Sequence, residues 1–247
     1  MKTIHINCDL GEGGKFDAQL MSLISACNIA CGGHAGDQNL MLQTIRMAMK
    51  NQVEIGAHPS YPDKENFGRK ILNISNSDLK KSICSQVLSL MKIAKNEGAK
   101  ISHFKPHGAL YNEAAKDENI AQIVVDSILK LDESLILYAP QNSIIADLAK
   151  TKVEVFFEAF VDRNYNPDYS LVSREKSNAL ITKKEEVFKH VFSMFSASKI
   201  RCENGEEITS FADTFCLHSD TENSVNIMRY LKEKFQKNEI EIRRYEQ

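Results

Sequence analysis

Short apolar runs alternate along the chain with longer stretches in which apolar residues recur every three or four positions. The short runs predict strands at residues 3–8, 28–31, 53–57, 101–105, 135–139, 153–157 and 214–217. The longer stretches predict helices around residues 41–48, 79–94, 120–131, 188–195 and 225–235. Strands that alternate with helices in this way indicate an α/β fold with a mainly parallel sheet covered by helices.

About seven such units follow one another with no linker rich in Pro, Gly or Ser. A chain of 247 residues is long enough for one β/α barrel. We therefore predict a single domain over residues 1–247, a parallel β/α barrel of about seven strands, with an open doubly wound sheet as the alternative. Residues 162–178 show no clear period and predict a long loop, which in a compact domain often serves as a lid or binding loop.

Composition narrows the possible partners. Lys and Arg number 31 against 33 Asp and Glu, with no long run of one sign, so the clustered basic face expected of a nucleic-acid-binding protein is missing. No apolar run approaches the roughly 18 residues of a membrane span, and Asp9 comes too early for a signal-peptide core. Six scattered cysteines without a C-x-x-C motif read as reduced thiols. We expect a cytoplasmic protein with no nucleic-acid or membrane partner.

Polar residues follow the predicted strands at their carboxyl ends, usually beside Gly or Pro. The segments are "NCDLGEG" (7–13), "ACGGHAGD" (30–37), "GAHPSYPD" (56–63), "KPHGALYN" (105–112), "EAFVDR" (158–163) and "LHSD" (217–220). Because the carboxyl ends of parallel strands meet on one face, these residues should converge on one site. The glycines would let a ligand approach the backbone there.

The titratable residues at these strand ends suit two kinds of chemistry. They are Asp9, Glu12, Lys105 and four of the seven histidines, His34, His58, His107 and His218. One aspartate with two histidines suits a divalent metal that activates water. The same groups suit metal-free acid–base catalysis in which Lys105 stabilises an oxyanion. The residues alone leave both open.

Other polar residues have a structural interpretation. Asp37 and Asp220 precede helical stretches, so each is as much a candidate N-cap as a site residue. Cys31 is better explained as a buried strand thiol than as a nucleophile, and its C-x-x-H spacing to His34 is too weak to indicate metal or thiolate chemistry. The histidines to which we assign no function are His5, His103 and His190.

Seven motifs together resemble the A subunit of the bacterial ATP-dependent 5-oxoprolinases, a family earlier described as lactam-utilisation proteins. In chain order they are "NCDLGEG", "NIACGGHAGD", "IGAHPSYPD", "ENFGRK", "FKPHGALYN", "EAFVDRNYNPDYSLVSR" and "CLHSD". The resemblance runs from about Ile4 to Lys237. It implies a distorted β/α barrel related to the glycoside hydrolase and deacetylase barrels. It also implies cleavage of 5-oxoproline to L-glutamate, coupled to hydrolysis of ATP to ADP and phosphate, with partner subunits B and C.

Within that resemblance, position and chemistry indicate catalytic roles for five residues. Asp9 or Glu12 would be the general base on water, and Lys105 with His107 would stabilise developing charge on oxygen. His34 is a further catalytic candidate. If a divalent metal is bound, the first-choice ligands are Asp9, His58 and His107, with His34 next.

Substrate contacts are expected from a second set of residues. Arg69 or Arg163 could hold the substrate carboxylate in a bidentate clamp, although a structural role for Arg69 is as plausible. The other expected contacts are Asn7, His58 and Tyr61. The family usually carries Phe where Gly33 stands, and commonly Pro or Ala at Gln38 and Gly at Ser219, so Gly33 is expected to enlarge the pocket beside His34.

The sequence has no P-loop motif, because "GEGGKF" (11–16) has the wrong spacing and position. We therefore expect ATP to be handled mainly by the partner subunits, while this barrel holds the lactam and carries out hydrolysis. Two alternatives stay open. One is a non-catalytic, lactam-binding scaffold subunit, and the other is a metal-dependent N-deacetylase of an acetylated sugar.

Overall fold

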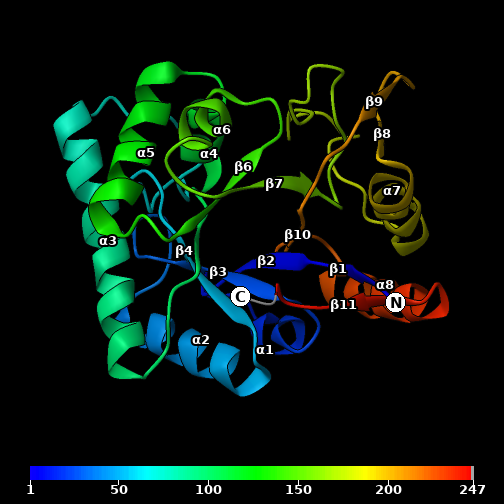
Figure 1. The fold of residues 1–247 in the computed structure, drawn as a ribbon, viewed down its shortest axis with the longest axis horizontal. Helices are drawn as coiled ribbons and strands as arrows, with labels where there is room; N and C mark the ends of the chain where they lie inside the picture. The colour runs from blue at the N-terminus through cyan, green and yellow to red at the C-terminus, as the bar shows by residue number, and fades with distance from the viewer. Residues whose placement is uncertain (246–247) are drawn as a thin grey trace.

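Seven parallel strands close into a barrel at the centre of the protein (Figure 1). The structure is a computed structural model that describes residues 1–245. The strands, in their order around the barrel, are β10 (Thr214–His218), β2 (Ile6–Leu10), β3 (Ala26–Ala30), β4 (Glu54–His58), β5 (His103–Phe104), β6 (Ile136–Pro140) and β7 (Val155–Phe160). Because β10 pairs with both β2 and β7, the sheet has no free edge. The predicted barrel of about seven strands is confirmed, and the open sheet is wrong.

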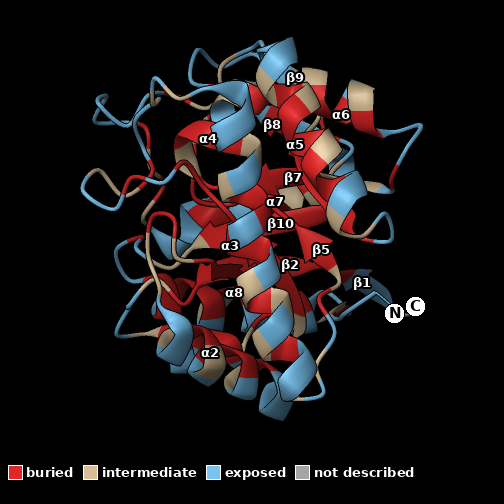
Figure 2. Ribbon diagram, turned by 90° about the vertical axis from the view of Figure 1, so that its left-hand side faces the viewer, coloured by how far each residue is buried: buried red, intermediate tan, exposed pale blue. Residues whose placement is uncertain are grey.

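Helices surround the barrel and expose one face each, while the strands are buried (Figure 2). They are α1 (Asp17–Met21), α2 (Gln38–Asn51), α3 (Asn76–Asn96), α4 (Gly108–Ala114), α5 (Glu118–Leu131), α6 (Ile144–Ala149), α7 (Lys184–Ala197) and α8 (Ser224–Lys237). The five helices predicted from apolar periodicity are α2, α3, α5, α7 and α8. The other three were not predicted, since a helix of five to seven residues is too short to display a period.

Two strand predictions need correction, and a hairpin was missed. Residues 3–8 are two strands, because the chain leaves the ladder at His5. The first, β1 (Lys2–Ile4), lies outside the barrel and pairs in parallel with β11 (Ile240–Ile242). A hairpin of β8 (Lys199–Arg201) and β9 (Glu207–Thr209) was also not predicted. The expected strand at residues 101–105 is shortened to the two residues of β5.

The interior of the barrel is polar. Asn28 on β3 donates a hydrogen bond to Asn7 on β2 at 2.7 Å, and Asn28 Oδ1 lies 2.8 Å from the His103 ring on β5. Asn7 also donates to Glu158 on β7 at 2.9 Å. The contacts to His103 and Glu158 skip an intervening strand, so they cross the inside of the barrel. Gly56 on β4 makes room for them, since a Cβ there would collide with the His103 ring.

The predicted long loop is confirmed, since residues 162–178 follow β7 with no helix or strand. Two isolated bridges, Arg163 to Leu180 and Tyr165 to Leu171, fold the loop back on itself. All six cysteines are buried free thiols, as expected. Within residues 1–245, no helix has the length and apolar character needed to cross a membrane.

Candidate active site

A cavity of about 770 Å³ opens at the carboxyl ends of the barrel strands. Its floor includes Asp9, Glu12, His58, Lys105 and His107, which lie at or just beyond the ends of three different strands. Its wall includes much of the loop 162–178. The expectation that distant strand ends converge on one mouth is therefore confirmed.

Lys105 is the most deeply buried charge on the cavity floor. Its Nζ donates to Asp9 Oδ1 at 2.9 Å and lies 3.0 Å from Glu158 Oε1 and 3.1 Å from Cys216 Sγ. Burial opposes the charge, but Asp9, Cys216 and Glu158 outweigh it and raise the pKa of Lys105 above its ordinary value. Lys105 is therefore an ammonium ion held in a fixed position.

Asp9 lies between this lysine and a group of histidines. Its Oδ1 also accepts from Asn28 at 2.8 Å, and its Oδ2 lies 3.5 Å from His58 Nε2. Burial would raise the pKa of Asp9, but His58 and Lys105 hold it well below its ordinary value. Asp9 is thus an ionised carboxylate on the floor of the cavity.

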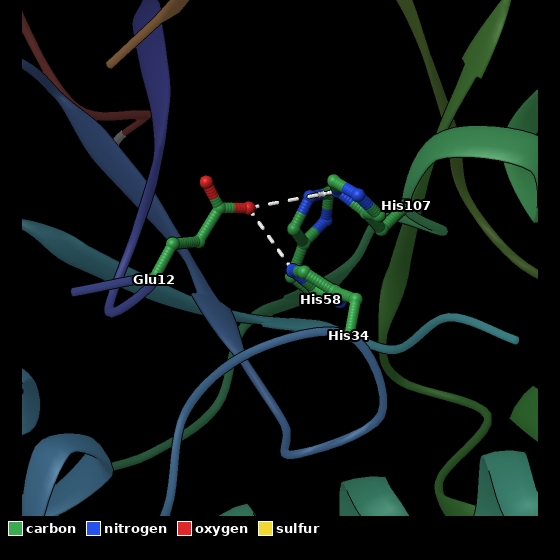
Figure 3. Close-up of side chains that lie close together, drawn as sticks. All are labelled: Glu12, His34, His58 and His107. Carbon is green, nitrogen blue, oxygen red and sulfur yellow. Dashed lines mark hydrogen bonds and ion pairs between the residues drawn. The ribbon is translucent and has the colours of Figure 1, made fainter. Parts of the chain in front are cut away.

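Glu12, His34, His58 and His107 form a compact group, here called the histidine cluster (Figure 3). One ligand atom from each residue lies within 4.8 Å of the others. Glu12 Oε1 is 3.0 Å from His34 Nε2 and 3.6 Å from His107 Nδ1. The rings of His34 and His107 stack in parallel with their centres 3.6 Å apart.

Burial determines the protonation of the histidine cluster. Burial, followed by the like charge of Asp9, raises the pKa of Glu12 to about 7. Burial and the neighbouring His58 lower the pKa of His34 to about 3 and hold that of His107 well below its ordinary value. His34 does not border the cavity itself and reaches it only through Glu12 and His107.

The motif "ENFGRK" contributes a glycine that fits against this cluster. Gly68 has φ +62°, a conformation that side chains disfavour. An added Cβ would lie 2.9 Å from His34 Cβ and 3.1 Å from His107 Cδ2. Gly36 has a similar role in the motif around His34, since its φ is +84° and a Cβ would lie 2.9 Å from the Ala30 carbonyl oxygen. Glycine is needed at these points to bring the loops together.

The rim of the cavity carries the predicted arginines. Arg69 forms an ion pair with Asp220 at 2.6 Å, and Arg174 of the long loop lies 3.8 Å from the same carboxylate. Asp220 is therefore not the N-cap of α8, a position taken by Asn223. Asp37, by contrast, caps α2 by accepting from the Leu40 amide.

Arg163 donates hydrogen bonds to two backbone carbonyl groups. Its Nη2 donates to the Val172 carbonyl at 2.7 Å and its Nε to the Ala179 carbonyl at 3.3 Å. Burial, then Arg174, lowers its pKa to about 10. Arg163 borders the cavity but also fixes the long loop, so the exposed Arg69 is the freer of the two candidate clamps.

Three sequence-based expectations do not agree with this geometry. Asn7 is fully enclosed and donates to Glu158, so it does not border the cavity. Tyr61 is buried away from the cavity, where burial and then the charges of Glu113 and Asp117 raise its pKa. Gly33 does not enlarge the pocket, because Gln86 and Ser60 fill the space beside it.

Two important residues received no role from the sequence. Glu158 is the second carboxylate on Lys105, and Asp162 is a fully buried partner of His218, with Oδ1 3.0 Å from His218 Nδ1. Both lie in "EAFVDR", and a glutamate within the apolar strand "VFFEAF" was the available signal. Of the four strand-end histidines, His218 therefore stands apart from the histidine cluster.

Comparison with known proteins gives a consistent result. The sequence profile of the LamB/YcsF family matches residues 4–247. Proteins named as the A subunit of 5-oxoprolinase are similar over nearly the whole chain. The one from Haemophilus influenzae is 40% identical over 243 residues, 98% of this chain and 99% of that protein. The one from Bacillus cereus is 41% identical over 249 residues, 98% of each chain.

Solved structures agree with the fold. The lactam utilization protein from Thermus thermophilus superposes with a TM-score of 0.92 at 30% identity, covering 99% of this chain and 100% of that one. A family 4 carbohydrate esterase from Streptomyces lividans has a TM-score of 0.52 at 7% identity, covering 97% of this chain and 90% of that one, a likeness of fold alone.

Proposed function

Because the chain belongs to the LamB/YcsF family, we propose that it is the A subunit of an ATP-dependent 5-oxoprolinase. It would open the lactam of 5-oxoproline to L-glutamate while ATP is hydrolysed to ADP and phosphate. The observation that carries this proposal is the buried pair of Asp9 and Lys105 on the floor of the cavity, 2.9 Å apart. Charged groups held in fixed positions at a cavity floor are well suited to stabilising the charge that develops when an amide is hydrolysed.

A five-membered lactam is a stable amide, so its opening needs activation. ATP would supply it by phosphorylating the amide oxygen, which makes the carbon susceptible to attack by water. We assign Asp9 as the general base that removes a proton from that water. The Lys105 ammonium would stabilise negative charge on oxygen, and the departing nitrogen must receive a proton when the carbon–nitrogen bond breaks. Breaking that bond leaves an acyl phosphate, and a second water would hydrolyse it to release phosphate and the glutamate carboxylate. Glu12 and His107 border the same floor and remain candidates for that proton transfer.

The substrate carboxylate and the nucleotide would bind elsewhere. Arg69 lies at the rim, where it can pair with a carboxylate, and Arg163 borders the same cavity. The glycine-rich turn after β2 does not suit a triphosphate, since the carboxylate of Asp17 already accepts from the Gly11 amide. We therefore propose that ATP is bound mainly by partner subunits B and C. We also propose that the assembled complex is cytoplasmic.

The test is glutamate release from 5-oxoproline and Mg-ATP, measured with this chain alone and with partner subunits B and C. Glutamate is expected only from the complete set. Asp9→Asn should lower the rate of the assembled complex by about 10²–10⁴-fold, the usual contribution of a general base. Asp147→Asn, an exposed carboxylate on α6, is the matched control and should leave the rate unchanged.

The other outcomes identify the alternatives. If Asp9→Asn assembles and retains the full rate, the chain is a lactam-binding scaffold and the site assignment is wrong. If an assembled wild-type complex forms no glutamate, the proposed reaction itself is wrong. Release of acetate from an N-acetylated sugar without ATP or partners would then identify a deacetylase.

A further inference from the structure

We infer that Glu12, His34, His58 and His107 form a binding site for one divalent transition-metal ion of the zinc type. This inference concerns what the isolated chain binds and does not depend on the proposed reaction. It changes the ligand set expected from the sequence, because Glu12 takes the place of Asp9. Four observations support it, each from contacts in the structure.

The first observation is the hydrogen bonding on the outer side of two rings. His58 Nδ1 lies 2.8 Å from the Lys105 carbonyl oxygen, and His107 Nε2 lies 3.0 Å from the Phe67 carbonyl oxygen. A carbonyl oxygen can only accept, so each of these nitrogens must carry a hydrogen. Metal-ligating histidines are commonly fixed in this way by a backbone carbonyl on the nitrogen opposite the metal.

The second observation is what this leaves on the inner side. The remaining nitrogens, His58 Nε2 and His107 Nδ1, face each other at 2.9 Å. In two neutral rings both would present lone pairs, which repel unless a cation lies between or beside them. The cation is either a proton, which would leave an imidazolium buried at this point, or a metal that accepts both lone pairs.

The third observation favours the metal, because four donors converge rather than two. Glu12 Oε1 is 3.6 Å from His107 Nδ1 and 3.0 Å from His34 Nε2, so the carboxylate reaches both rings, and one ligand atom from each of the four residues lies within 4.8 Å of the others (Figure 3). With zinc–ligand bonds of about 2.0–2.1 Å, neighbouring ligand atoms on one ion stand about 2.9–3.4 Å apart. The shortest of the observed separations lie close to that range, and side-chain shifts that also part the stacked rings of His34 and His107 would complete the site.

The fourth observation explains why Asp9 is excluded. Its Oδ1 is held by Lys105 and Asn28, and its Oδ2 contacts the cluster only through His58 at 3.5 Å. Asp9 therefore borders the site without joining it. Three imidazoles and one carboxylate, with no thiolate, suit zinc and also manganese, cobalt or nickel. Such an ion, when bound, would polarise an oxygen of water or of the substrate.

The experiment measures metal binding by the isolated full-length chain. The protein is stripped with a chelator, titrated with Zn²⁺ in competition with a chromogenic chelator, and its metal content is measured by mass spectrometry after gel filtration. One ion per chain is expected, with a rise in Tm, because the ion binds the folded state. Substitution with Co²⁺ should give the visible absorption of a nitrogen- and oxygen-ligated site.

Variants assign the ligands. His58→Gln and Glu12→Gln should each weaken Zn²⁺ binding by at least about a hundredfold, since each removes a ligand outright. His218→Gln is the matched control, because this histidine lies at the same end of the barrel but pairs with Asp162. His218→Gln and Asp9→Asn should keep one ion per chain. Far-ultraviolet circular dichroism tests whether each variant is folded. If His58→Gln does not fold, Glu12→Gln still tests the ligand set, because Glu12 lies outside the helices and strands and is partly exposed.

The inference is overturned if the wild-type chain retains none of Zn²⁺, Mn²⁺, Co²⁺ or Ni²⁺. It is equally overturned if His58→Gln and Glu12→Gln bind as tightly as His218→Gln. Loss of the ion in Asp9→Asn would refute the assigned ligand set. Nitrogen-15 shifts of a doubly protonated His58 that persist when Zn²⁺ is added would show that a proton holds the two rings. None of these readouts depends on lactam hydrolysis, so failure here leaves the proposed reaction standing.

Discussion

Gly68 shows how closely single residues control the candidate site. Its positive φ turns the chain beside the histidine cluster, and hydrogen at this position lets His34 and His107 stack (Figure 3). Backbone strain and steric contact are separate effects, and the chain offers a position where only the first applies. At Gly98, φ is +76° and nothing lies within 4 Å of an added Cβ.

We expect Gly98→Ala to lose about 1–2 kcal/mol, because it forces a side chain into the left-handed region, and Gly68→Ala to lose more, because its methyl group also collides with His34 and His107. Only Gly68→Ala should also lower glutamate formation, by about tenfold to a hundredfold, because its methyl group displaces two rings of the cluster. Urea unfolding and the glutamate assay measure the two effects. Equal activity in the two variants would contradict a steric role for Gly68.

For single residues, the sequence identified which of them lie at the strand ends, but not which of their side chains reach the cavity. Asp9, Lys105 and His107 were recognisable because each follows an apolar run. The period of two along a strand makes Asn7 and Asp9 point the same way, yet only Asp9 reaches the cavity. Depth along the barrel separates them, and depth depends on the strand register. Tyr61 was also expected to contact the substrate but does not border the cavity, since a loop can turn a side chain to either side.

At the scale of elements, helix starts follow local chemistry. Asp37 has an extended backbone and its carboxylate accepts from the Leu40 amide at 2.9 Å, so it satisfies one of the free amides at the start of α2. The sequence could propose Asp37 as an N-cap, but it could not show that Asp220, which also precedes a helix, has a different role. The difference is tertiary, because Arg69 draws Asp220 across the rim.

We expect Asp37→Ala to lower the free energy of unfolding by about 0.5–2 kcal/mol, the usual value of an N-cap. Asp37→Asn is the matched control, since asparagine caps helices about as well, and should cost only a few tenths of a kcal/mol. Urea unfolding monitored by circular dichroism compares the two. If alanine and asparagine were equivalent, the hydrogen bond to Leu40 would contribute nothing.

For the whole molecule, the seam between β7 and β10 decides whether the barrel closes. Asp162 follows β7 and accepts from both the backbone amide and the ring of His218 at the end of β10. Burial would raise the pKa of Asp162, but His218 and Thr221 outweigh it and keep the pKa below its ordinary value. The ionised carboxylate therefore stabilises the closed barrel.

A group whose pKa is lowered by folding stabilises the protein above its unfolded pKa, about 3.9 for Asp, and loses that effect as the pH falls. Asp162→Asn should therefore cost about 1–3 kcal/mol at pH 5, a cost that shrinks as the pH falls below about 4. Urea unfolding at several pH values measures it. A difference from wild type that grows as the pH falls below about 4 would contradict the assignment. Asp147→Asn, exposed on α6, is the control and should stay within about 0.5 kcal/mol at every pH.

The sequence predicted the barrel because segments with the period of a strand alternate with segments with the period of a helix. These periods can be recognised without knowing any tertiary contact. The sequence did not predict that β1 would pair with β11, because nothing local relates residues at opposite ends of the chain. The sequence also did not predict that the barrel interior is polar. Single polar residues such as Asn28 and Glu158 look like interruptions in apolar strands until the closed sheet brings them together.

Closure of the barrel has a consequence for synthesis on the ribosome. Ile6 on β2 pairs with Phe215 on β10, and β1 pairs with β11, so both pairings join segments that are far apart in the sequence. Until β10 emerges, a nascent chain must carry β2 with one edge unpaired, and unpaired strand edges promote aggregation. Such distant pairings also slow folding, because a long segment must be ordered before the contact forms. The growing polypeptide therefore carries an open sheet until β10 emerges, and β10 then converts that sheet into a protected one.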